Sequence, residues 1–105
     1  MTRRYSDHLV QYLNDPTVEN TVGVRLGRLC VDANIPAVYV AHATDVSRLT
    51  VHAWFRGGDI RRNNRRVIEV LIEHLERDMR EGVLPAKSRQ DAKQYIEGIT
   101  GMAIT

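Results

Sequence analysis

The stretch AVYVAHATDVSRLTVHAWFR, from Ala37 to Arg56, decides how this chain folds. It contains two short helical patterns that meet at residues 44–46 (Thr-Asp-Val). Ser47 stands at the N-cap position of the second pattern, because its hydroxyl can accept a hydrogen bond from a free backbone N–H group. Residues 57–58, both glycine, end that pattern, since glycine adopts the left-handed C-terminal conformation at little steric cost. The stretch therefore predicts two short helices joined by a tight turn.

Each pattern has one apolar side, because its apolar residues recur with the 3.6-residue period of a helix. The inward positions are Val40 and Ala41 in the first pattern, and Val51, Trp54 and either Leu49 or Thr50 in the second. The two helices are thus expected to pack on a common core.

A longer helix is predicted before the pair, from Thr17 to Asn34, with its inward stripe at Val22, Leu26, Leu29 or Cys30, and Ala33. Gly23 and Gly27 lie four residues apart and would let another helix approach closely. Asn34-Ile35-Pro36 ends this helix, because proline pushes the preceding residue out of helical geometry.

The longest pattern follows the pair, from Asn64 to about Glu81, with Asn63 or Asn64 as the cap. Its apolar residues cover more than half of the helical circumference, which is wider than packing on one small core requires. Two interpretations stay open: a central helix buried by neighbours on two sides, or a helix that gives part of its apolar face to a homodimer.

Two further helices are predicted near the ends. One runs through Asp7 to Leu13, with Ser6 as its cap, and packs on the core or on a partner. Tyr5 takes the stapling position before the cap, and Tyr12 lies on one side of the helix with Leu9 and Leu13. The other begins at the capping-box sequence of residues 88–91 and ends near Glu97, at Gly98 and Gly101. The short apolar tail of residues 102–105 is expected to dock, to exchange between subunits or to fray.

The fold class predicted is all-α, since no segment has a convincing strand pattern. A chain of 105 residues with 43% hydrophobic residues suits one compact domain. We assign residues 16–81 to the core, residues 1–15 to an N-terminal extension, and residues 86–105 to a C-terminal extension that serves oligomerisation.

The positive charge is concentrated in one segment, although the formal net charge of the whole chain is only +2. Between positions 48 and 66 the single acidic residue is Asp59, and the basic residues are Arg48, Arg56, Arg61, Arg62, Arg65 and Arg66. Such segregation favours contact with a polyanion at one face, and a solvated arginine loop is the alternative. Arg3 and Arg4 are also available to a phosphate backbone.

Several classes of function are disfavoured. Cys30 is the only cysteine and is expected to be a core residue, and the four histidines lack the spacing of a zinc site, so we predict no metal and no cofactor. No apolar run approaches a membrane span and no signal-peptide core follows Met1, which makes the cytoplasm the expected location. No serine or cysteine is placed for activation, so we predict no catalytic residues and no enzyme.

The central stretch resembles the helix-turn-helix of the Cro and CI repressor (Xre-like) family, within the lambda-repressor-like DNA-binding domains. The resemblance covers roughly Val22 to Leu75 and is carried by Val40-Ala41, Val46-Ser47, Val51, Trp54 and Gly57. It implies a lambda-repressor-like helical bundle, here with added N- and C-terminal helices. Two positions depart from the family pattern. Asp45 replaces the usual turn glycine of positive φ, a conformation that aspartate tolerates better than most residues. Ala37 replaces a glutamine that often opens the first motif helix.

In that family the second motif helix lies in the major groove of DNA. The resemblance implies base contacts from the outward residues Ser47, Arg48, Leu49, Thr50, His52 and Ala53. Phosphate contacts are assigned to Arg56, Arg61, Arg62, Arg65 and Arg66, which would set affinity and salt dependence. Arg48 contacting only phosphate, Leu49 as a core residue and His52 as a solvent residue are the alternatives.

The function implied is sequence-specific binding of double-stranded DNA by a homodimeric transcriptional regulator, a repressor of phage or prophage type acting on a palindromic operator. No small-molecule ligand is expected. Two alternatives remain: a DNA-packaging assembly protein such as a phage terminase small subunit, and a module that binds the host polymerase.

Overall fold

The computed structural model describes residues 5–104, and this part of the chain is all-helical, with six helices and no strand. The helices are α1 (Asp7–Asn14), α2 (Val22–Ala33), α3 (Ala37–Thr44), α4 (Arg48–Phe55), α5 (Arg62–Arg80) and α6 (Arg89–Thr100). The predicted all-α fold class is confirmed. None of the helices between residues 5 and 104 combines the length and the apolar character needed to cross a membrane.

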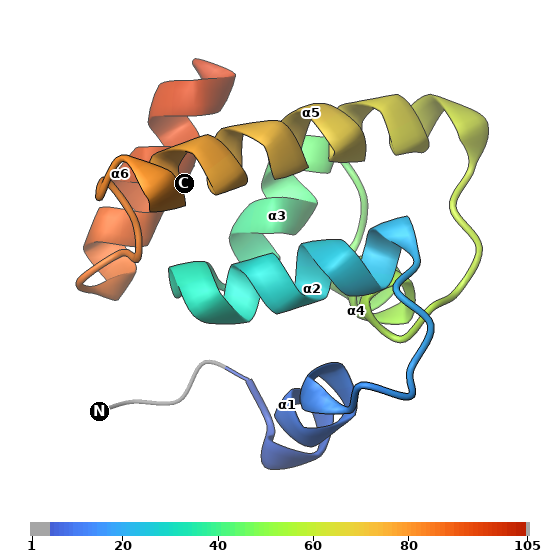
Figure 1. Ribbon diagram of the computed structural model, residues 1–105. Coiled ribbons are helices and arrows are strands. Elements are labelled where there is room, and N and C mark those ends of the chain that lie inside the picture. Colours follow the sequence, from blue (N-terminus) through green and yellow to red (C-terminus); the bar gives the residue numbers. More distant parts are fainter. Residues whose placement is uncertain (1–4, 105) are drawn as a thin grey trace.

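Helix α2 lies at the centre of the bundle. It packs against α5, α4 and α1, and Figure 1 shows α1 and α5 on opposite sides of it. Helix α3 packs against α4, α5 and α6. The largest side chains of the core, Trp54 and Phe55, come from α4 and are almost completely buried. Cys30 is buried in the same core, as predicted, and burial raises the pKa of its thiol.

The prediction that α2 begins at Thr17 is wrong, because the helix begins at Val22. The Asp15 carboxylate accepts hydrogen bonds from the Thr17 N–H at 2.9 Å and from its hydroxyl at 2.7 Å, which favours a turn over a helix here. The hydroxyl of Thr21 then accepts from the Val24 N–H at 3.2 Å and caps the helix.

Two other predicted ends also need correction. Helix α5 begins at Arg62, and its N-cap is Arg61 without a side-chain cap bond, so neither Asn63 nor Asn64 is the cap. Helix α6 continues beyond Glu97 and through Gly98 to Thr100, and only Gly101, the C-cap with φ +73°, ends it as predicted. Continued packing on the core side outweighs the low helix propensity of one glycine, since Ile96 is buried and Ile99 is half-buried.

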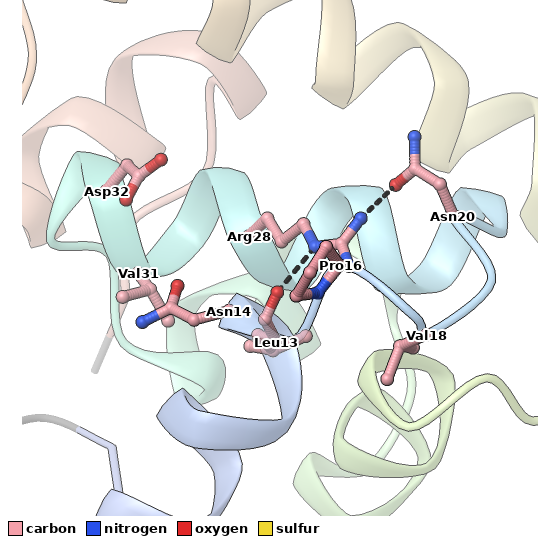
Figure 2. Close-up of a pocket in the computed structure, with 8 residues that line it drawn as sticks. All are labelled: Leu13, Asn14, Pro16, Val18, Asn20, Arg28, Val31 and Asp32. Carbon is pink, nitrogen blue, oxygen red and sulfur yellow. Dashed lines mark hydrogen bonds between the residues drawn. The ribbon is translucent and has the colours of Figure 1, made fainter.

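Arg28 holds the segment between α1 and α2 (Figure 2). Its guanidinium donates to the carbonyl oxygens of Leu13 at 2.6 Å and Asp15 at 3.2 Å, and to the Asn20 side-chain oxygen at 2.8 Å. These carbonyls lie at the C-terminal end of α1, where the helix leaves acceptors without intrahelical donors. The predicted N-terminal helix therefore packs on the core of its own chain.

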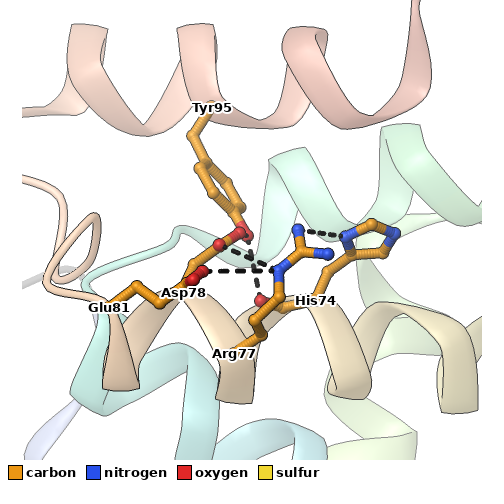
Figure 3. A network of polar contacts seen from close by, with 5 residues as sticks. All are labelled: His74, Arg77, Asp78, Glu81 and Tyr95. Atoms are coloured by element: carbon orange, nitrogen blue, oxygen red, sulfur yellow. Dashed lines mark hydrogen bonds and ion pairs between the residues drawn. The ribbon is translucent and has the colours of Figure 1, made fainter.

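A polar network joins α5 to α6 (Figure 3). The Tyr95 hydroxyl donates to the carboxylate of the buried Asp78, and the Arg77 guanidinium lies 3.3 Å from the other carboxylate oxygen. Arg77 also lies 3.1 Å from Nδ1 of His74. The C-terminal tail docks on α6, because the Ile104 N–H donates to the Glu97 carboxylate at 2.7 Å.

Candidate nucleic-acid interface

The turn between α3 and α4 depends on the residue that ends α3 and on the residue that caps α4. Asp45 ends α3 with φ +57° and ψ 47°, the left-handed conformation expected at this position from the sequence. Ser47 begins α4, and its hydroxyl accepts a hydrogen bond from the Thr50 N–H at 3.1 Å. Both predictions are confirmed. Between them, the Val46 N–H donates to the Ala41 carbonyl at 3.1 Å, which completes a closed turn.

The inner side of α4 is fixed by close contact with α2. Val51, Trp54 and Phe55 are buried. A Cβ atom at Gly27 would lie only 3.0 Å from the Phe55 ring, so the predicted close approach at the two α2 glycines is confirmed. This contact leaves α4 with one defined outward side.

The outward side of α4 includes Arg48, Leu49 and Ala53, all of them exposed. Leu49 is 78% exposed, and the interpretation of Leu49 as a core residue is therefore wrong. The Thr50 side chain is half-buried, and its hydroxyl forms a hydrogen bond of 2.9 Å with the Ser47 hydroxyl. The Leu49 side chain thus lies on the solvent side of α4, next to Arg48.

His52 differs from its neighbours because aromatic rings cover one side of it. Its ring centroid lies 6.3 Å from that of Tyr5 and 5.9 Å from that of Phe55, both in edge-on arrangements. Partial burial, followed by the charges of Arg48 and Arg56, lowers the pKa of His52. The residue is half-buried, so the interpretation of His52 as a free solvent residue is wrong.

The predicted phosphate-contacting arginines, Arg56, Arg61, Arg62, Arg65 and Arg66, are all exposed. Among residues 5–104, Arg65 lies 3.9 Å from Glu69, whereas Arg48, Arg56, Arg61, Arg62 and Arg66 form no ion pair. Arginines elsewhere have structural roles, since Arg25 lies 2.7 Å from Glu76 and Arg28 holds a loop. The guanidinium groups between residues 48 and 66 are thus exposed and, apart from that of Arg65, have no acidic partner among residues 5–104, so they can contact an external anion. Arg3 and Arg4 lie outside the described residues.

Sequence reasoning missed the role of two tyrosines. The Tyr12 hydroxyl donates to the Arg56 carbonyl at 3.0 Å, at the C-terminal end of α4. The buried Tyr5 packs against His52 and Phe55, and its hydroxyl donates to the Ile35 carbonyl. The sequence placed both residues on or beside α1 as packing residues, but no local pattern connects them to a helix more than forty positions away.

Comparison of the chain with protein-family models, with curated proteins and with solved structures finds no match to any of them. In the described part of the chain, no three His, Cys, Asp or Glu residues lie together in a way that could hold a metal ion.

Proposed function

We propose that this protein is a sequence-specific, double-stranded DNA-binding regulator of transcription, a homodimer whose α4 enters the major groove. The resemblance of residues 22–75 to the Cro and CI repressor family supports this function, and it favours a repressor of phage or prophage type. The observation that carries the proposal is the outward side of α4, where Arg48 and the 78%-exposed Leu49 have no role in the fold.

The chemistry of this side suits the edges of base pairs. The forked guanidinium of Arg48 can donate two hydrogen bonds to O6 and N7 of guanine, while Leu49 and Ala53 offer apolar contact to a thymine methyl group. The Ser47 and Thr50 hydroxyls bond to each other, so they can bind a phosphate or a base only by rotating. His52 lies at the edge of this surface and contacts DNA only on the side that Tyr5 leaves open.

The exposed arginines that follow α4 suit the phosphate backbone. Arg56, Arg61 and Arg62 are exposed and form no ion pair among residues 5–104, and Arg65 has only a long contact to Glu69. Binding of such residues to phosphates releases counterions, so affinity falls steeply with salt but does not depend on base sequence. Arg48 and Arg65 are therefore assigned different roles.

The test is selection of binding sites from random DNA by the full chain, followed by affinity measurements over a range of salt concentrations. Arg48→Ala should reduce affinity for the selected site by about 1–3 kcal/mol and relax sequence choice at one base pair. Arg65→Ala should weaken binding to all DNA and reduce the salt slope by about one. Arg80→Ala removes the same charge from the far end of α5 and should change neither property.

Failure of the full chain to enrich any sequence, with no preference over random DNA at moderate salt, would overturn the proposal. If Arg48→Ala and Arg65→Ala had the same effect on selected and random DNA, the assignment of base reading to α4 would be wrong.

A further inference from the structure

Helix α5 carries an exposed stripe that its own fold does not cover. Asn63, Val67, Val70, His74 and Arg77 follow one another at alternating steps of four and three residues, so they lie along one side of the helix. Val67 is 44% exposed and Val70 is 47% exposed. The other side of α5 holds the core residues Ile68, Leu71, Ile72 and Leu75.

The stripe borders an apolar hollow between α5 and the C-terminal segment. The hollow has a volume of about 240 Å³ and is lined by Val67, Val70 and His74 on one side and by Ile99, Thr100 and Met102 on the other. Met102 is itself 51% exposed. Three partly exposed apolar side chains thus surround one hollow, a concentration that marks a contact surface.

The charges beside the stripe are complementary to those on a second copy of the same helix. Arg66 and Glu73 are seven residues apart, nearly two full turns, so they lie on the same flank of the stripe. Both are exposed, and neither forms an ion pair among residues 5–104. When two copies of one helix pack antiparallel, residues on the same flank face each other, so Arg66 of each copy faces Glu73 of the other.

We propose that two copies of this chain associate through α5, packed antiparallel about a two-fold axis close to Val70. Val70 of each copy then meets Val70 of the other, and Val67 meets His74. The two Arg66–Glu73 pairs flank this apolar centre and fix the antiparallel direction. An identical patch on both subunits, complementary to itself, is what a two-fold dimer requires.

This assignment gives Arg66 a protein contact in place of the phosphate contact that the sequence suggested. It supplies the homodimer of the proposed function, and it rests on that function only for the requirement that two copies act together. Solution mass is measured without DNA, so a failure here is distinguishable from a failure of DNA binding.

The experiment is sedimentation equilibrium of the full chain over a range of concentrations, with Arg66→Glu, Glu73→Arg and the double variant. Each single change places like charges at both symmetric contacts and should weaken the dimer about tenfold or more. The double change exchanges the two charges and should restore the dimer to within about threefold of the original Kd.

Two variants serve as controls. Lys87→Glu and Glu19→Arg change the net charge equally but lie outside α5, and each should leave the dimer Kd within about threefold of the original. Circular dichroism confirms that every variant folds, which is expected because all four positions are exposed. A monomer at every concentration, an assembly larger than a dimer, or a double variant as weak as the singles would each overturn the proposal.

Discussion

The backbone carbonyl of Trp54 lies directly against Gly23, where a Cβ atom on Gly23 would overlap its oxygen. This contact brings the backbone of α4, the candidate recognition helix, directly against the backbone of α2. It exists because Gly23 has no side chain, and it sets how far the outward side of α4 stands from the core.

Gly23→Ala should destabilise the protein by about 1–3 kcal/mol, because the added methyl group must push α4 away from α2. Gly98→Ala is the matched control. A Cβ at Gly98 meets nothing within 4 Å, and replacing a glycine within a helix should stabilise by about 0.5–1 kcal/mol. Urea unfolding followed by circular dichroism measures both changes, and equal effects of the two substitutions would contradict the packing argument.

Asp45→Gly should leave stability unchanged or slightly raised, because glycine adopts the left-handed conformation of the turn without steric cost. Asp45→Val should cost about 1–2 kcal/mol or more, since a β-branched side chain is strained at φ +57°. Thermal unfolding of the two variants gives the comparison. A valine variant as stable as the glycine variant would show that the turn rearranges.

The Asp78–Tyr95 contact should make stability depend on pH. The Tyr95 hydroxyl, and then Arg77, lower the pKa of the Asp78 carboxyl. Because the pKa is lower in the folded state, the contact stabilises the fold above the ordinary carboxyl pKa of about 3.9, and this stability is lost as pH falls through the lowered pKa.

Asp78→Asn should therefore flatten the acid limb of a plot of unfolding free energy against pH. Tyr95→Phe, which removes the donor, should cost roughly 1 kcal/mol at neutral pH. Glu19→Gln, at an exposed site, should leave the profile unchanged. An Asp78→Asn profile parallel to that of the original protein below pH 5 would exclude this carboxyl as the source.

Leu49→Ala should separate binding from folding. At 78% exposure the side chain contributes little to the core, so the free energy of unfolding should change by less than about 0.5 kcal/mol. Under the proposed function, affinity for the selected DNA should fall by about 1 kcal/mol, since a methyl contact in the groove is lost. Val83→Ala, at a 58%-exposed site in the α5–α6 loop, should alter neither quantity.

Local side-chain chemistry made much of the fold predictable. Ser47 as a cap, Asp45 in the left-handed turn and the spacing of Gly23 and Gly27 each depend on residues close in sequence, and each is confirmed. The start of α2 was missed because the turn at Asp15 competes with a helix that the apolar period alone extends too far.

The candidate site was predictable only in part. The outward placement of Arg48 and Ala53 came from the family resemblance, and both residues are exposed. Leu49 could not be assigned, because a shift of one residue in the helical period moves it from the outer to the inner side. The covering of His52 depends on Tyr5, a contact across 47 positions that no periodicity encodes.

The two tyrosines of the N-terminal segment have a consequence for the kinetics of the proposed DNA binding. Helix α4 has eight residues, too few to be stable alone. Tyr5 packs against His52 on the flank of α4, and the Tyr12 hydroxyl donates to the carbonyl of Arg56, the C-cap of α4. A helix immobilised before it meets its partner loses little conformational entropy on binding. Substituting Tyr5 or Tyr12 should therefore shorten the lifetime of the proposed complex with DNA, although neither substitution changes the side chains that contact the DNA.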